Sequence, residues 1–334
     1  MVSAVIFVAT SCVSPLTGFA FWETNLAYEG ESIYNYLQVK NLSDRTILST
    51  NVLFGVQSVT MKDKGLTGMY YDTALAAPAL ADNANSALIL GMGTGTNARQ
   101  LKQYYPKMNI TGVEIDQKIT DLAGEYFDEP ADIPVTTYDG RAWLAASHDK
   151  YDVIMVDAYQ DITIPFQMSS TEFFTMVREH LNPGGVMVVN MNMISDGQGS
   201  INEALSDTIA SVFGNGNTLT ADVPNTTNRE LFAKKPGSGS EENSMQQASK
   251  ALNLRETTYE RTGSEDLEWY MEEVASRFRK VNEPDSASTI LTDDKAPVEV
   301  LGMHAIDQII ADEAGPYRQI LKDEGFGGLL RAVQ

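Results

Sequence analysis

The 334-residue sequence predicts an α/β fold, in which helices cover a mainly parallel sheet and a small antiparallel β-domain comes first. A glycine-rich loop, Gly91-Met-Gly-Thr-Gly95, follows an apolar run typical of a buried strand and precedes a predicted helix that ends before Pro106. A second predicted strand, Ile110–Glu114, ends in a carboxylate 23 residues after Gly91. This order predicts a nucleotide-binding βαβ unit, with a glycine turn in an ordinary α/β sheet as the alternative.

Three acidic residues, Glu114, Asp139 and Asp157, stand at the ends of successive predicted strands. Because the carboxyl ends of parallel strands meet at the edge where ligands bind, we expect these side chains to lie close together. The loop lacks the phosphate-binding pattern GxxxxGK followed by Ser or Thr, so a nucleoside triphosphate is not expected. An acidic rim favours a cationic adenosine ligand, such as S-adenosylmethionine or its decarboxylated form. A helix cap or a surface acid is the alternative for Asp157.

Composition excludes several classes of protein. A hydrophobic content of 43% predicts a folded core rather than disorder. The net charge of −21 argues against a nucleic-acid partner and is compatible with a cationic small molecule, although it also suits general solubility or a salt-adapted host. The single cysteine, Cys12, excludes an internal disulfide framework, and His148, His180 and His304 show no metal-ligand spacing, so no metal site is predicted.

The first 22 residues are uncharged and apolar in parts, but polar residues and Pro15 interrupt the run. The run lacks a basic start, so it is a poor secretory signal, and it is marginal for the ~20 apolar residues of a membrane-spanning helix. Two interpretations stay open for 1–27: a membrane-helix remnant, through which 1–22 would associate with a membrane, or a buried N-terminal arm. We expect a cytoplasmic protein, with or without membrane association.

An ordered set of motifs resembles the spermidine synthase (polyamine aminopropyltransferase) family, which has the class I methyltransferase fold. In the core these are Gly91–Gly95, Gly112-Val-Glu-Ile-Asp116, Tyr138-Asp-Gly-Arg141, Tyr151-Asp-Val-Ile-Met-Val-Asp157, Ser170-Thr-Glu-Phe-Phe174 and Leu181-Asn-Pro-Gly-Gly185. Glu31–Val39 and Gly55–Ser58 resemble the family's N-terminal β-domain, and Leu66–Asp72 its gatekeeping segment. Thr292–Glu299 resembles a bacterial branch in which the domain is often fused behind membrane helices.

The resemblance and the residue patterns together predict the organisation of the chain. We expect an N-terminal antiparallel β-domain over 28–81, a Rossmann-like catalytic domain over 82–235, a flexible loop over 236–250, and a helical segment with a tail over 251–334. Within the catalytic domain, Ser170–Leu181 is predicted as an amphipathic helix with Phe173, Phe174 and Val177 facing inward.

The resemblance implies transfer of an aminopropyl group from decarboxylated S-adenosylmethionine to a polyamine such as putrescine, with no tightly bound cofactor. It implies catalytic roles for Asp157, Asp161 and Tyr71. The donor would be bound by Gln57, Gly91, Gly93, Gly95, Glu114, Asp139 and Gly140. The acceptor would be bound by Asp72, Tyr159 and Gln160. We also expect a homodimer.

Four departures from the family pattern fall mainly in the acceptor half of the site. Thr94 replaces an acid of the glycine loop, Asn35 replaces a glutamine, Asp72-Thr73 replaces a His or Gln-Glu pair, and Asp157-Ala-Tyr-Gln-Asp161 replaces DSSDP. Two other functions therefore stay open. One is methyl transfer from intact S-adenosylmethionine, whose carboxylate Thr94 would not repel. The other is a non-catalytic adenosyl-ligand-binding domain that acts as a sensor or regulates a membrane partner.

Overall fold

The computed structural model describes residues 23–51, 56–159, 164–192, 199–237, 244–286, 288–303 and 322. The N-terminal arm or membrane remnant expected over 1–27 therefore lies outside the described residues as far as 22, and the first strand begins at Leu26. Within the described ranges, no helix combines the length and the apolar character needed to cross a bilayer.

The predicted N-terminal β-domain forms a four-stranded antiparallel sheet in chain order. Its strands are β1 (Leu26–Glu31), β2 (Tyr36–Asn41), β3 (Arg45–Thr50) and β4 (Ser58–Met61). A turn at Ser43-Asp44 joins β2 to β3 and is closed by a 2.8 Å hydrogen bond from the Leu42 amide to the Arg45 carbonyl. Leu37, Val39 and Leu48 are buried against helix α5 (Gln117–Tyr126), so apolar packing attaches this sheet to the rest of the protein.

The central sheet has eight strands in the order β12-β10-β11-β9-β8-β5-β6-β7. Neighbouring strands from β9 to β7 are parallel: β5 (Ser86–Leu90), β6 (Asn109–Glu114), β7 (Val135–Thr137), β8 (Tyr151–Val156) and β9 (Leu181–Met191). Three antiparallel strands extend the sheet beyond β9: β10 (Thr218–Asp222), β11 (Arg229–Lys234) and β12 (Phe278–Lys280). Starting from β5, the chain adds β6 and β7 on one side of this strand, and it then returns to add β8 and β9 on the other side. This reversal creates a crevice at the carboxyl ends of β5 and β8.

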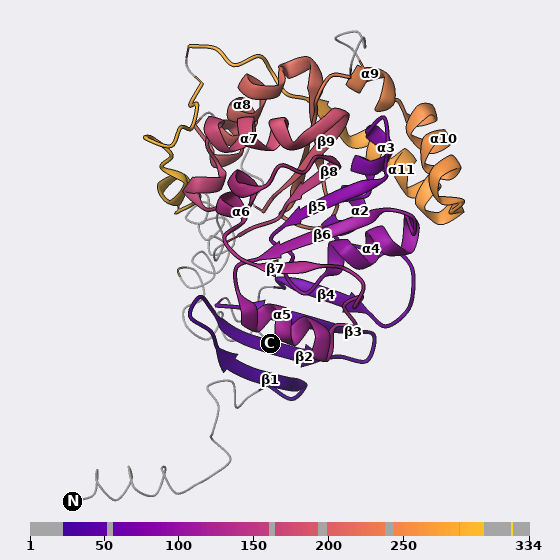
Figure 1. Ribbon diagram of the computed structural model, residues 1–334, viewed down its shortest axis with the longest axis vertical. Coiled ribbons are helices and arrows are strands. Elements are labelled where there is room, and N and C mark those ends of the chain that lie inside the picture. Colours follow the sequence, from indigo (N-terminus) through magenta and orange to yellow (C-terminus); the bar gives the residue numbers. More distant parts are fainter. Residues whose placement is uncertain are drawn as a thin grey trace, which may run out of the picture.

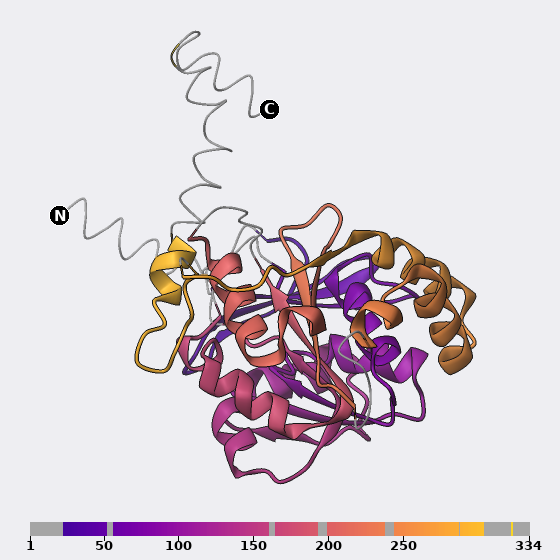
Figure 2. The ribbon, with the colours of Figure 1, turned by 90° about the horizontal axis from the view of Figure 1, so that it is seen from above.

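Helices cover both faces of the central sheet (Figures 1 and 2). One face carries α2 (Tyr70–Ala74), α3 (Ala76–Leu80), α4 (Thr96–Tyr104), α9 (Ser244–Ala248), α10 (Ala251–Thr262) and α11 (Glu265–Arg277). The other carries α6 (Gly140–Ala146), α7 (Thr171–His180) and α8 (Ile201–Phe213). Short 3-10 turns lie at Phe166–Met168 and Asn215–Asn217. The expected α/β fold with an N-terminal antiparallel domain is confirmed.

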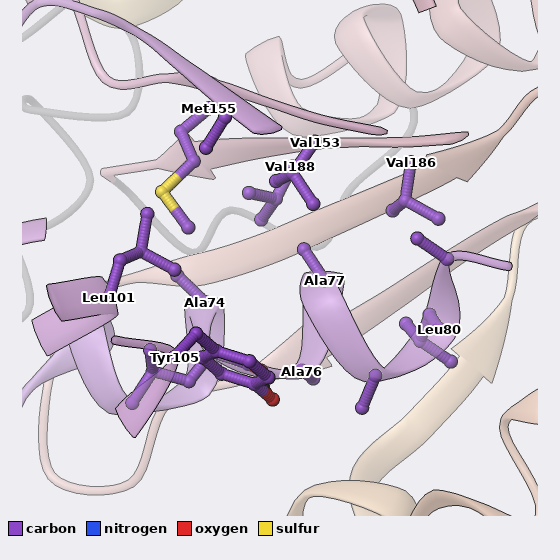
Figure 3. Close-up of a cluster of buried hydrophobic side chains, with 14 of the residues drawn as sticks. Ala74, Ala76, Ala77, Leu80, Leu101, Tyr105, Val153, Met155, Val186 and Val188 are labelled. Carbon is purple, nitrogen blue, oxygen red and sulfur yellow. Dashed lines mark hydrogen bonds between the residues drawn. The ribbon is translucent and has the colours of Figure 1, made fainter. Parts of the chain in front are cut away.

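The strand side chains alternate between two apolar cores. Along β5, Ala87 and Ile89 enter one core and Leu88 and Leu90 the other, and all four are fully buried. Parallel strands buried on both faces therefore read as continuous apolar runs. Figure 3 shows the first core, in which helical residues lie against strand residues Val153, Met155, Val186 and Val188. The predicted inward face of α7 is also correct, because Phe173, Phe174 and Val177 are fully buried.

Three segments differ from the expectations. Residues 70–80 were expected in the β-domain, but they form α2 and α3 and pack on the central sheet. The segment 236–250 contains α9, because Met245 is buried in the core and holds this helix there. The C-terminal helical segment is broken at Gly263, whose left-handed conformation ends α10, and it continues into β12. The central sheet therefore extends beyond residue 235.

Candidate functional site

A cavity of about 290 Å³ lies between the N-terminal sheet and the carboxyl ends of β5, β6 and β8. The three predicted strand-end acids, Glu114, Asp139 and Asp157, all line it. The described residues around this cavity include no lysine, arginine or histidine. The described lining of the site is therefore acidic and offers no basic side chain that would neutralise it.

The glycine loop shapes the inner wall of the cavity through two left-handed residues. Gly91 has φ +86°, and a Cβ atom at this position would lie 2.4 Å from the Asp157 carbonyl oxygen. Gly93 has φ +55°, and its amide donates a 2.8 Å hydrogen bond to Glu114. Gly95, expected to bind the donor, is the N-cap residue of helix α4 and does not line the cavity.

Glu114 ends β6 with its carboxylate held by backbone amides. One oxygen accepts from Gly93 and the other accepts from Asp116 at 3.0 Å. The side chain is 6% exposed, and burial raises the pKa of Glu114 above its ordinary value. Backbone donors fix the orientation of the carboxylate, and its remaining lone pairs are available to a ligand that donates hydrogen bonds.

Asp157 follows β8 and accepts three side-chain hydrogen bonds. Tyr70 donates through its hydroxyl at 2.7 Å, Asn190 through its amide at 2.9 Å and Asn97 at 3.2 Å. Burial raises the pKa of Asp157, and these hydrogen bonds oppose part of that rise. All three partners are neutral groups, so the carboxylate is oriented without an ion pair. A buried carboxylate oriented in this way can serve as a proton acceptor for a cationic ligand.

The gatekeeping segment places Tyr70 and Tyr71 side by side, with ring centroids 4.0 Å apart. Tyr71 lines the cavity as predicted, and its hydroxyl donates to the Gln57 carbonyl at 3.2 Å. Gln57 lines the cavity as well, so the two residues close it from the side of the N-terminal sheet. Burial raises the pKa of Tyr71, which keeps its hydroxyl protonated.

Asp139 and Gly140 begin helix α6 at the far end of the cavity. The Asp139 carboxylate caps this helix by accepting from the Ala142 amide at 2.7 Å, and both residues line the cavity. The next residue, Arg141, donates to the Gln167 carbonyl and forms a two-pronged ion pair with Asp293. The Tyr138–Arg141 and Thr292–Glu299 motifs therefore meet, and together they hold the segment that contains Gln167 against the cavity.

Besides Gly95, four of the expected residues contribute differently or are not described. Asp72 is fully buried outside the cavity, where its carboxylate accepts from Thr67 and Gly68 and holds their turn. It is therefore not available to an acceptor. Tyr159 lines the cavity, but its hydroxyl is engaged with the Asn190 carbonyl and the Asn192 amide. Gln160 and Asp161 lie outside the described residues.

Thr94 is fully buried and does not line the cavity. The argument that Thr94 spares a ligand carboxylate from repulsion therefore loses its basis, because this side chain does not face the cavity. Asn97, the second residue of helix α4, borders the cavity instead.

The sequence reading missed three polar residues of the site: Tyr70, Asn97 and Asn190. Tyr70 precedes the predicted Tyr71 within the Leu66–Asp72 motif, and Asn97 lies two residues after Gly95 of the glycine loop. Both residues are next to features that the sequence analysis named. Asn190 lies near the end of β9, which neighbours β8, so a strand-end search extended by one strand would have found it.

Comparison with known proteins gives a consistent set of relatives. The model of the spermine/spermidine synthase domain matches residues 69–235. A probable polyamine aminopropyl transferase of Bifidobacterium longum is 99% identical over 334 residues, which are all of this chain and 75% of that protein. A polyamine aminopropyltransferase of Vibrio vulnificus is 28% identical over 209 residues, covering 60% of this chain and 69% of its own.

Solved structures support the fold. A probable spermidine synthase from Corynebacterium glutamicum superimposes with a TM-score of 0.55 at 22% identity, covering 79% of this chain and 98% of that chain. A spermidine synthase in complex with the transition-state analogue AdoDATO superimposes with a TM-score of 0.52 at 20% identity, covering 64% of this chain and 75% of that chain.

The contact between Gly91 and Asp157 can be tested with a pair of glycine substitutions. Gly91→Ala should lower the free energy of unfolding by about 1–2 kcal/mol or more, because a Cβ atom is strained at this φ and meets backbone. Gly124→Ala is the control: Gly124 lies in α5 with open space around it, so alanine should stabilise the helix by about 0.5–1 kcal/mol. Urea unfolding measures both changes. Equal stability of the two variants would contradict the close approach at Gly91.

Proposed function

The chain belongs to the spermine/spermidine synthase family, and from this premise we propose that it transfers an aminopropyl group from decarboxylated S-adenosylmethionine to a polyamine such as putrescine. The observation that carries the proposal is the charge of the cavity, which has three carboxylates and no basic residue among its described lining. Both proposed substrates are cations, one a sulfonium with a primary ammonium group and the other a diammonium.

The same charge distribution favours the decarboxylated donor over intact S-adenosylmethionine. A unit charge about 4 Å from a carboxylate contributes on the order of 4 kcal/mol at an effective dielectric constant of about 20. The additional carboxylate of intact S-adenosylmethionine would be repelled by Asp157 and would find no basic partner among the described residues that line the cavity. Methyl transfer, which needs the intact form, therefore fits this cavity less well.

The adenosyl half of the donor would lie along the rim formed by β5, β6 and the start of α6. The oriented carboxylate of Glu114 would accept hydrogen bonds from the ribose hydroxyls, and charge-assisted bonds of this kind contribute roughly 1.5–3 kcal/mol each. Asp139 and Gly140 would face the adenine, with Asp139 accepting from its amino group. Gly91 and Gly93 would let the backbone approach the ligand, since neither carries a side chain.

The acceptor ammonium must lose a proton before its nitrogen can attack the carbon next to the sulfonium. At an ordinary amine pKa of ~10.4, forming the free base at pH 7 costs about 4–5 kcal/mol. Asp157 would accept that proton and orient the amine. The new carbon–nitrogen bond forms as the carbon–sulfur bond breaks, and the sulfur leaves as the neutral thioether methylthioadenosine. Asp157 then releases its proton to solvent. The expected homodimer stays a prediction.

The choice of donor is tested by calorimetric titration with decarboxylated and intact S-adenosylmethionine. We expect the decarboxylated form to bind at least tenfold more tightly, because it lacks the carboxylate that the acidic cavity repels. Methylthioadenosine, which has neither the ammonium nor the carboxylate, serves as the reference ligand. A tenfold preference for the intact form would contradict aminopropyl transfer and would favour methyl transfer as the function.

The role of Glu114 is tested with Glu114→Gln, which keeps the shape of the side chain and removes its charge. Affinity for methylthioadenosine should fall about tenfold, or ~1.5 kcal/mol, because the ribose hydroxyls lose a charged acceptor. Glu125→Gln, on the exposed surface of α5, makes the same chemical change away from the cavity and should leave the affinity as it is. Unchanged binding by Glu114→Gln would mean that the ribose lies elsewhere.

The role of Asp157 is tested with Asp157→Asn and a pH profile of kcat/KM. Turnover should fall about 10²-fold or more, the usual scale for a lost general base, while donor binding changes less. Because burial raises the pKa of Asp157, the wild-type rate should fall on acidification at a higher pH than an exposed aspartate would produce. This acid limb should disappear in the variant. Near wild-type turnover would remove Asp157 from catalysis and leave Asp161 as the candidate base.

A further inference from the structure

A second, much smaller cavity of about 10 Å³ lies behind Asp157, which is enough space for roughly one water-sized group. Asp157 and Asn97 line both this cavity and the main one, so the two spaces meet at these side chains. Tyr70, Asn190 and Glu230 complete its polar wall. The proposed mechanism assigns no role to Glu230.

Glu230 is an unusual residue for the interior of a sheet. It lies on β11 directly opposite Asn190 of β9 and is 1% exposed. Its Oε1 atom has no hydrogen-bond partner among the described residues. The Oδ1 atom of Asn97 is buried and unpaired in the same way. Two acceptors without donors thus line one small cavity, and Asp157 contributes the carboxylate beside them.

No described residue around this cavity carries a positive charge. The adjacent Arg229 makes an ion pair with Asp222 within the β10–β11 hairpin. Burial raises the pKa of Glu230 well above its ordinary value, and the charge of Asp157 raises it further. Burying an acid next to another acid without a cation is costly, unless a ligand supplies the cation.

We propose that the small cavity is a subsite for one primary ammonium group, held by Glu230, Asn97 and Asp157. An alkylammonium group has three N–H donors and is close to water in size, and the cavity presents three groups with free or shareable acceptor oxygens. This inference rests on the proposed function, in which two substrates carry such a group. The aminopropyl end of the donor and one end of the acceptor diamine are the two possible sources.

The subsite would position the substrates as well as bind them. Asp157 borders both cavities. An ammonium group in the small cavity would therefore lie on one side of the Asp157 carboxylate, with the reacting amine on the other side. Glu230 does not border the main cavity and is therefore a specificity-determining residue rather than a proton acceptor for the reacting amine. A ligand without a primary ammonium group would gain nothing from it.

The test compares Glu230→Gln with wild type in calorimetric titrations of decarboxylated S-adenosylmethionine and methylthioadenosine, and in steady-state kinetics with putrescine. Glutamine has the same shape, so the fold should be kept. If the donor occupies the subsite, affinity for the decarboxylated form should fall tenfold or more with methylthioadenosine unchanged. If the acceptor occupies it, the KM for putrescine should rise tenfold or more with both donor-site affinities unchanged.

Two further variants sharpen the result. Asn97→Ser removes one of the unpaired acceptors and should change the same ligand in the same direction, but by less. Glu129→Gln is the matched control, because Glu129 also has a buried, unpaired Oε1 but lines neither cavity, and it should change no ligand.

Three outcomes overturn the subsite. Unchanged values in Glu230→Gln would mean that the cavity holds only water. Equal losses for methylthioadenosine and the decarboxylated donor would mean that Glu230 supports the shape of the site and does not recognise an ammonium group. If wild type binds neither adenosyl ligand, the proposed function fails, and the subsite fails with it. The first two outcomes leave the proposed function intact.

Discussion

The close approach of the Gly91 backbone to the Asp157 carbonyl is the constraint on which the site depends. A Cβ atom at residue 91 would lie 2.4 Å from that oxygen, so only glycine lets the ends of β5 and β8 come this close. The two strands are neighbours at the point where the sheet order reverses. Their contact brings the glycine loop, Glu114 and Asp157 to one rim, where a ligand can touch all three.

The fold provides for the buried acids in three different ways. Glu114 is satisfied by backbone amides of its own rim. Asp157 is satisfied by neutral side chains from three separate elements, α2, α4 and β9. Glu230 keeps one oxygen without a partner among the described residues. These three environments match the roles proposed for the three acids. Glu114 is a fixed acceptor for hydroxyl groups, and Asp157 is a base whose charge changes during the reaction. Glu230 is a carboxylate that a bound cation stabilises.

The structure shows which of the departures from the family pattern lie at the cavity and which do not. Thr94 does not reach the cavity, and Asp72 holds a turn behind the gatekeeping tyrosines. Asn35, which stands where the family has a glutamine, lines the cavity and donates to Asp116 at 3.0 Å. A polar contact therefore links the N-terminal β-domain to the segment that follows β6. In the proposed subsite, Glu230 of strand β11 takes the part of the acid that the glycine loop lacks.

The sequence by itself determined where the parallel strands follow one another along the chain, the position of the glycine loop and the three acids at the strand ends. These features depend on local patterns, namely apolar runs, glycine conformation and the polarity of the residue after a strand. The tertiary structure alone decided which other side chains join Asp157, because Tyr70, Asn97, Asn190 and Glu230 lie 33 to 87 positions from Asp157 along the chain. It also decided that Asp72 and Thr94 face away from the cavity. Side-chain direction at such positions depends on packing between elements, which no local pattern of residues records.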